Sequence, residues 1–184
     1  MEQKFDFVQV TSEPNHYELI KELYRLHKEQ ANKLFDLSCG IETDEDILDV
    51  VKSAVDNDVV LMAIDKTTDR YAGCFIFDDM RIYNDEIISC DVHIVISKKY
   101  WGKNSRLIIK ECYKFLNDNM KPIKRMGCSV PSNNLGIIKL LKDVGFKIEG
   151  TCKGKLIYKN KSGIPTLYNE LCYSNLNLER LLNG

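Results

Sequence analysis

The spacing of apolar residues changes repeatedly along this chain between the period of a strand and the period of a helix. Alternating or continuous apolar runs predict strands at Phe5–Val10, Val59–Ile64, Tyr71–Phe77, Glu86–Ile96, Ile123–Val130, Phe146–Tyr158 and Leu167–Ser174. Helical spacing predicts helices over Pro14–Leu34, Thr43–Val55, Ile108–Leu116 and Leu135–Val144. We expect a mixed α/β sheet, with an antiparallel meander whose last two strands are joined through Asp78–Asp85.

Length and composition predict the number of domains and argue against two kinds of partner. The 184 residues suit one domain, and no Pro-, Gly- or Ser-rich linker divides residues 1–184. The 26 basic and 27 acidic residues leave a net charge of −1, so we expect no nucleic-acid partner. No apolar run approaches the roughly 20 residues of a membrane helix, so no membrane partner is expected.

The cysteines are numerous but show no binding pattern in the sequence. There are seven, an odd number, and no pair has C-x-x-C spacing. This pattern argues against a disulfide framework and against a zinc site, so we expect no metal. A reducing cytoplasm is the expected location.

The segment Asp91–Asn104 joins a strand, a polar loop and the start of a helix. Backbone N–H groups at a helix start, together with the positive end of the helix dipole, form a site for phosphate groups. Gly102 allows the backbone to approach a ligand closely. Four basic side chains add favourable charge nearby: Lys98, Lys99, Lys103 and Arg106.

The same segment resembles the acetyl-CoA-binding core of the GNAT N-acetyltransferases. It is most similar to the branch that includes the ribosomal-protein N-terminal acetyltransferases. In that branch an acidic residue on the fourth strand precedes a Tyr-Trp-Gly-Lys-Gly turn, and Asp91 precedes Tyr100-Trp101-Gly102-Lys103 at the same spacing. A second block agrees, with Asn134, then Gly145-Phe146 and Glu149-Gly150.

The resemblance implies a GNAT-like fold, with a mostly antiparallel central sheet flanked by helices and splayed between strands four and five. It implies acetyl-CoA as co-substrate, lying in that splay, and an acetyl group moved to a primary amine of a small molecule or protein. The residues implied in cofactor binding are Ile94, Val95, Ile96, Lys99, Tyr100, Trp101, Gly102, Lys103, Asn104, Ser105, Arg106 and Asn134. A homodimer is compatible with the resemblance.

Two side chains are candidates for proton transfer. The resemblance makes Asp91 the base that takes the amine proton. His93 stands two residues further on, so it projects to the same face of the strand, and an unperturbed imidazole has a pKa of about 6.5. The alternatives are a surface role for Asp91, a hydrogen-bonded structural role for His93, packing roles for Tyr100 and Trp101, and a helix-capping role for Asn134.

Three residues depart from the family pattern. Asn104 stands where the family has Gly or Ala, and Leu141 and Ile137 stand where it often has a Tyr or a Ser able to protonate the leaving thiolate. They motivate an alternative function, a catalytically weak or inactive binding or structural module. The abundance of Lys, Asn and Ile is compatible with a phage gene.

Overall fold

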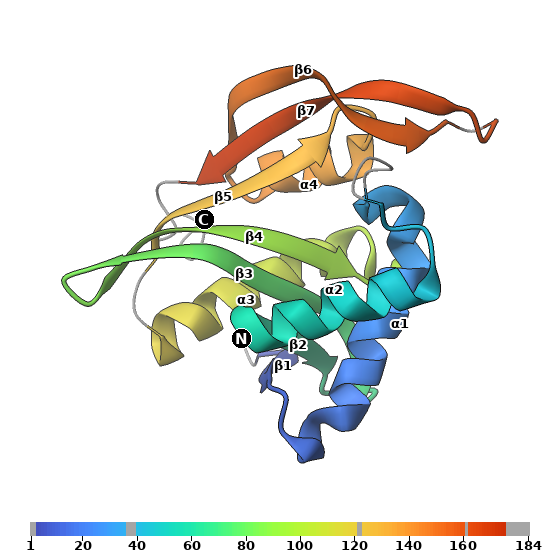
Figure 1. Ribbon diagram of the computed structural model, residues 1–184. Coiled ribbons are helices and arrows are strands. Elements are labelled where there is room, and N and C mark those ends of the chain that lie inside the picture. The colour runs from blue at the N-terminus through green and yellow to red at the C-terminus, as the bar shows by residue number, and fades with distance from the viewer. Residues whose placement is uncertain (1–2, 36–39, 121–122, 161, 176–184) are drawn as a thin grey trace.

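The computed structural model describes residues 3–35, 40–120, 123–160 and 162–175 (Figure 1). Within these residues seven strands form one sheet in the order β1-β2-β3-β4-β5-β7-β6. Neighbouring strands pair antiparallel, apart from β4 and β5, which pair in parallel. The strands are β1 Phe5–Val10, β2 Val59–Asp65, β3 Arg70–Tyr83, β4 Glu86–Ile96, β5 Ile123–Pro131, β6 Lys147–Lys159 and β7 Pro165–Asn175. The predicted mixed, mostly antiparallel sheet is confirmed.

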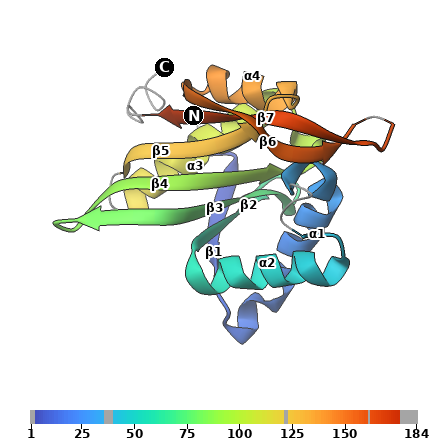
Figure 2. The same ribbon diagram turned by 45° about the horizontal axis from the view of Figure 1, so that its top comes forward.

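Helices cover both faces of the sheet (Figures 1 and 2). The α-helices are α1 Tyr17–Leu34, α2 Asp44–Asn57, α3 Lys103–Asn119 and α4 Leu135–Asp143, and the 3-10 turns are η1 Pro14–His16 and η3 Lys98–Tyr100. The helices α1 and α2 pack on one face, and α3 and α4 pack on the other. None of the helices in the described ranges is long and apolar enough to cross a bilayer.

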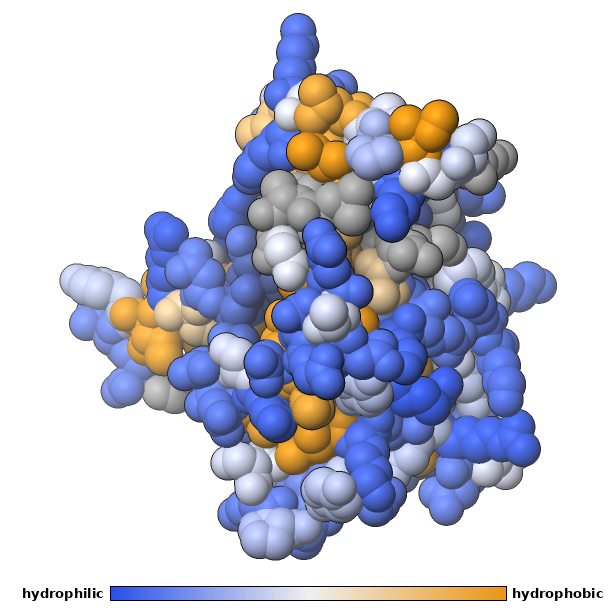
Figure 3. All heavy atoms as spheres, turned by 45° about the vertical axis from the view of Figure 1, so that its right-hand side comes forward, coloured by the Kyte–Doolittle hydropathy of each residue, from blue (hydrophilic) through white to orange (hydrophobic). Residues whose placement is uncertain are grey.

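Alternation along β4 divides its side chains between the two faces. Cys90 and Val92 enter the core cluster beneath α3 and α4, whereas Val95 enters the cluster beneath α1 and α2. Because side chains two residues apart share a face of a strand, Asp91 and His93 lie on the same face as Val95. The surface turned forward in Figure 3 is mainly hydrophilic, with apolar residues in small separate patches, as expected for amphipathic covering helices.

The connection between β3 and β4 differs from the prediction. Asp78–Asp85 was expected to be a linking segment, but β3 continues to Tyr83 and turns tightly through Asn84 and Asp85. Both turn residues have positive φ, 48° and 63°, which Asn and Asp tolerate better than most residues. Two consecutive acidic residues, Asp78 and Asp79, interrupt the apolar run of β3 before Met80 and Ile82 resume the alternation, so the sequence reads as a link there.

Two predicted helix boundaries are confirmed by their capping geometry. Thr43 and Asp46 form a reciprocal capping box at the start of α2, in which each side chain accepts from the other residue's backbone N–H. Gly145 follows α4 with φ of +88°, the left-handed conformation expected there. Pro14 does not begin the α-helix directly, because the 3-10 turn η1 precedes α1.

Replacing Thr43 by Ala removes the oxygen that accepts the Asp46 N–H at 3.1 Å. We expect the free energy of unfolding to fall by about 1 kcal/mol. The melting temperature should then fall by about 2–4 °C, measured by differential scanning calorimetry. The control Thr43→Ser keeps the oxygen and should melt near the wild type, and equal losses in both variants would contradict the capping role.

Candidate functional site

The pairing of β4 with β5 stops halfway along both strands. The paired residues are Ile87 with Ile123, Ser89 with Arg125, Cys90 with Met126 and finally Asp91 with Gly127. Beyond this last pair, β4 continues to Ile96 and β5 continues to Pro131 without pairing to each other, and the two strands diverge (Figure 1). We call the space between residues 92–96 and residues 128–131 the fork.

Each strand has another partner along the fork, which keeps it open. The β4 strand stays paired with β3 as far as Ile96, opposite Gly73. The β5 strand pairs with β7 as far as Pro131, opposite Glu170. At the open end, the Ile96 carbonyl accepts hydrogen bonds from Gln30 Nε2 at 2.6 Å and from Trp101 Nε1 at 2.9 Å.

Asp91 stands at the closed end of the fork, where its carboxylate lies against the backbone of Gly127. A Cβ added at Gly127 would stand 2.2 Å from Asp91 Oδ1. The glycine therefore makes room for the carboxylate between the two strands. The predicted base is thus an exposed residue at the junction of β4 and β5.

His93 occupies the neighbouring position on the same face. Its Nε2 lies 3.1 Å from Asp78 Oδ2 on β3, so it has the hydrogen-bonded environment that the structural alternative predicted. Burial and the nearby Asp78 carboxylate raise the pKa of Asp58, which follows α2, although His93 opposes this effect. Burial also lowers the pKa of His27 on α1, and His93 adds to that effect. Ionisable groups from β3, β4, α1 and the end of α2 therefore lie near one another on the face of the sheet that carries Asp91 and His93.

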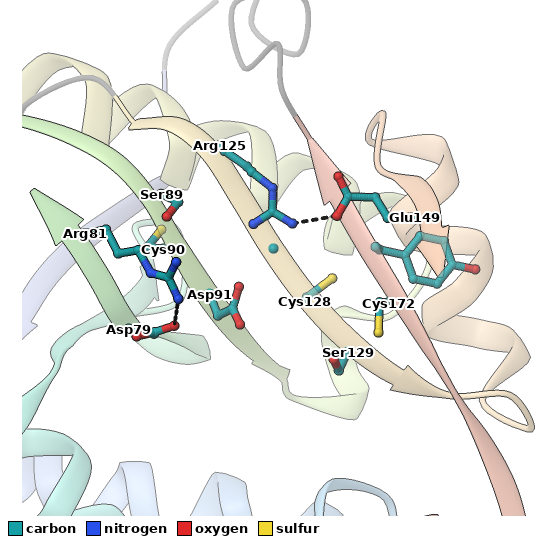
Figure 4. Close-up of a pocket in the computed structure, with 12 residues that line it drawn as sticks. Asp79, Arg81, Ser89, Cys90, Asp91, Arg125, Cys128, Ser129, Glu149 and Cys172 are labelled. Carbon is teal, nitrogen blue, oxygen red and sulfur yellow. Dashed lines mark hydrogen bonds and ion pairs between the residues drawn. The ribbon is translucent and has the colours of Figure 1, made fainter. Parts of the chain in front are cut away.

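A cavity of about 270 Å³ lies over the closed end of the fork and is called the fork cavity here (Figure 4). Arg125 of β5 donates to Glu149 of β6 at 2.5 Å across its wall. The Ser174 hydroxyl, and then Arg125, lower the pKa of Glu149. The cavity is lined by Asp79, Arg81, Ser89, Cys90, Asp91, Arg125, Gly127, Cys128, Ser129, Glu149, Cys172 and Tyr173.

Sequence reasoning identified few of these lining residues. Arg125 and Cys172 carry no local signal, because only strand pairing brings them beside Asp91. Gly127 could have been found, since a glycine inside a strand often marks a close approach of another group.

The predicted phosphate loop lies between the open end of the fork and α3. Gly102 precedes α3 with φ of +86° and has no side chain with which to cap the helix. The backbone N–H groups of the first turn of α3 therefore have no partner within the helix. The buried Ser105 hydroxyl donates to the Tyr100 carbonyl at 2.9 Å and holds the loop to the helix. Lys103 is exposed beside this turn.

Other loop residues are used in packing and ion pairs. Tyr100 is only 7% exposed and packs edge-on against Phe5, as the packing alternative predicted, whereas Trp101 is 48% exposed. Arg106 forms an ion pair with Asp143 at 2.9 Å. Asn104 Oδ1 lies 3.5 Å from Lys4 Nζ.

A second cavity, of about 360 Å³, adjoins the loop on the α1 side. Lys99 and Tyr100 line it together with Lys98. Residues of α1 and β3, among them Glu22, Glu29 and Arg70, form much of the remaining lining. Lys99 therefore lines a cavity on the α1 side of the loop.

Three predicted positions lie within α4 or immediately before it. The Asn134 side chain accepts from the Ile137 N–H at 3.4 Å, so it caps the helix as the alternative role proposed. Leu141 is 2% exposed and belongs to the core, and Ile137 packs against the same core. These apolar side chains offer no proton to a leaving group.

Comparisons with known proteins place this fold among solved structures. No family model and no curated protein matches the chain. A spermidine N-acetyltransferase from Vibrio cholerae, solved with CoA and spermine, matches with 13% identity and a TM-score of 0.68, over 99% of this chain and 100% of that one. A ribosomal-protein-S5-alanine acetyltransferase from Vibrio fischeri matches with 16% identity and a TM-score of 0.64, over 96% of this chain and 94% of that one.

A GNAT-family acetyltransferase from Streptococcus pneumoniae also matches, with 19% identity, a TM-score of 0.61 and coverage of 93% of this chain and 99% of that one. At these identities the similarity establishes the fold, which is that of the GNAT acetyltransferases. The ribosomal-protein branch is one of several among these neighbours.

The contact between Gly127 and Asp91 can be tested by a double-mutant cycle. Gly127→Ala should lower the melting temperature because the new methyl group displaces the Asp91 carboxylate. Asp91→Ala in the same chain should restore most of the loss, with a coupling energy of about 0.5–3 kcal/mol from thermal denaturation.

Gly73→Ala is the comparison variant, because its added Cβ would meet the Val95 carbonyl oxygen of the backbone at 2.6 Å. Asp91→Ala should not restore the melting temperature that Gly73→Ala loses. Additive effects of Gly127→Ala and Asp91→Ala would contradict the proposed contact.

Proposed function

We propose that this protein is an acetyl-CoA-dependent N-acetyltransferase. The observation that carries the proposal is the fork, with a carboxylate at its closed end and an uncapped helix N-terminus near its open end. This arrangement offers one site for a reacting amine and another for a pyrophosphate, joined by strand backbone. The resemblance of the Asp91 and Tyr100–Lys103 motifs to the GNAT family supports the same function.

The open strand edges of the fork suit a ligand that resembles an extended peptide. The pantetheine arm of CoA contains amide groups, which can pair with strand backbone as a peptide does. The backbone of Val92–Val95 has no β5 partner, so it can make such contacts, whereas the Ile96 carbonyl already accepts from Gln30 and Trp101. The N–H groups at the start of α3 would bind the pyrophosphate, with Lys103 adding positive charge.

The chemistry requires an amine without its extra proton and a polarised carbonyl. Acetyl-CoA supplies an acetyl group activated as a thioester. Asp91 accepts the amine proton, directly or through water, so that the amine nitrogen can form the new bond to the acetyl carbon. Backbone N–H groups of β4 donate to the carbonyl oxygen as negative charge develops there.

As the carbon–sulfur bond breaks, the sulfur leaves as a thiolate. A thiol has a pKa of about 8–9, so its thiolate is a good leaving group without a dedicated acid. Apolar residues at 137 and 141 are therefore compatible with turnover.

The acceptor would approach from the α1 and α2 side of the sheet. That face presents the Asp91 carboxylate, with Asp78 and Asp58 nearby, and such a setting attracts an amine that carries positive charge in solution. Two neighbours are named for amine acceptors, spermidine and the alanine of a ribosomal protein. The acceptor class proposed here is a primary amine of a small molecule or protein.

Asp91→Asn removes the base and keeps the size of the side chain. We expect kcat to fall by about 100-fold or more, with acetyl-CoA affinity nearly unchanged, because the carboxylate acts on the amine. A coupled assay for released CoA thiol, run on a panel of amines, gives kcat, and calorimetry gives the affinity. Asp79→Asn is the matched control, since Asp79 lines the same cavity beyond the fork. Equal turnover in Asp91→Asn and the wild type would remove Asp91 from this role.

Gly102→Ala tests the cofactor loop. The residue has φ of +86°, so a side chain would strain the turn and shift the N–H groups before α3. Acetyl-CoA affinity should weaken on the order of tenfold, measured by calorimetric titration. Gly163→Ala is the control, because Gly163 has φ of +77° in the distant β6–β7 turn and carries the same strain.

If the wild type shows no saturable binding at millimolar acetyl-CoA, the proposed function is wrong. The alternative, a GNAT-fold binding module, then takes its place.

A further inference from the structure

Three side chains able to bind a metal converge on the β6–β7 hairpin. They are Cys152 on β6, and Glu170 and Cys172 on β7. One ligand atom from each, the two sulfurs and a carboxylate oxygen, lies within 4.8 Å of the other two. Cys152 is exposed, Cys172 is half-buried and Glu170 is buried.

The register of the two strands creates this convergence. Cys152 pairs directly with Glu170, and Cys172 stands two residues further along β7, so its side chain is on the same face. Gly150 pairs with Cys172, and a Cβ added there would meet nothing within 4 Å. Open space is therefore present beside Gly150, the residue opposite Cys172.

A bulge in β6 brings a fourth side chain, with a positive charge, to the cluster. Three residues, Lys153, Gly154 and Lys155, stand between the pairs Cys152–Glu170 and Leu156–Tyr168, where β7 has only Asn169. Gly154 adopts φ of +57° within this bulge. Bulges redirect side chains, and here Lys155 Nζ reaches Glu170 Oε2 at 2.6 Å.

The charges in this cluster suit a divalent cation. The Glu170 side chain is 11% exposed, and Lys155 orients its carboxylate while keeping its own end in solvent, at 57% exposure. Two thiolates and one carboxylate would carry three negative charges. A divalent cation and the Lys155 ammonium would balance them.

The types of ligand indicate which cations fit. Thiolates favour soft and borderline metals, and zinc accepts sulfur and carboxylate oxygen in tetrahedral geometry. Zinc–sulfur distances of about 2.3 Å place two tetrahedral ligands about 3.8 Å apart, close to the spacing in the cluster. Three protein ligands leave one position for water on the exposed side of Cys152.

We propose that Cys152, Glu170 and Cys172 form a binding site for a thiophilic divalent cation of the zinc class. Binding forms two metal–sulfur bonds and one metal–oxygen bond and releases the two thiol protons to solvent, with no change of oxidation state. None of the three ligands has a role in the proposed acetyl transfer, so the metal proposal does not rest on that function. Cys172 also lines the fork cavity, so the bound cation would lie at the wall of that cavity (Figure 4).

The test is a zinc titration of the full chain, made metal-free and kept reduced with a phosphine, in competition with a chromogenic chelator. The wild type should bind one equivalent of zinc. Cys152→Ser and Cys172→Ser should weaken binding by about 100-fold or more, and Glu170→Gln should weaken it by about tenfold or more. Cys128→Ser is the matched control, because Cys128 is a half-buried thiol on the neighbouring strand β5 and should leave binding unchanged.

A second readout locates the bound metal. Zinc should protect Cys152 and Cys172 from alkylation, mapped by mass spectrometry, while Cys128 reacts equally with and without zinc. Cobalt(II) in place of zinc should give the intense absorption of cobalt–thiolate bonds, and Cys152→Ser should reduce this absorption by about half or more, because one of the two thiolates is lost. Since Cys152 is exposed, this variant leaves the core packing intact.

Three results would overturn the proposal. They are the absence of stoichiometric zinc binding by the reduced wild type, zinc binding as tight in Cys152→Ser as in the wild type, and zinc protection that maps to other cysteines.

Discussion

The incomplete pairing of two parallel strands is the constraint on which the rest of the structure depends. At the point of separation the Asp91 carboxylate lies where a side chain on residue 127 would otherwise be, so a larger residue there would have to displace that carboxylate. Beyond that pair, β3 and β7 hold the diverging strands from their outer edges. The fork therefore remains open while β4 stays paired with β3 and β5 stays paired with β7.

The two faces of the sheet differ in what they carry. The face beneath α3 and α4 holds the larger core cluster and ends at the uncapped start of α3. The face beneath α1 and α2 carries Asp91, His93 and the fork cavity. A ligand between the strands would contact a phosphate-binding end and a reacting end at once, which is the physical basis of the proposed acetyl transfer. The thiol cluster on β6 and β7 adjoins the second face through Cys172.

Much of the fold could be predicted because its signals are local. Each predicted strand and helix is present, although α3 begins at Lys103 rather than Ile108 and β3 ends at Tyr83 rather than Phe77. The capping residues Thr43 and Gly145 have the expected conformations. The extension of β3 to Tyr83 was missed because Asp78 and Asp79 interrupt its apolar run. Tyr100 and Asn134 have the packing and capping roles that the sequence left open beside cofactor binding. The cofactor-binding and catalytic roles of the predicted residues stay predictions.

By itself, the sequence determined the order of the elements, the glycine at the start of α3 and the carboxylate on β4, since each depends on residues close together in the chain. Only the tertiary structure decided which strands pair, where the β4–β5 pairing stops and which side chains meet across strands. The contact of Arg125 with Glu149 and the convergence of Cys152 with Glu170 and Cys172 depend on such pairings. The cysteine spacing argued against a local zinc motif, yet strand register places these two thiols and a carboxylate together. Register is a cooperative property of the whole sheet, so no short stretch of sequence encodes it.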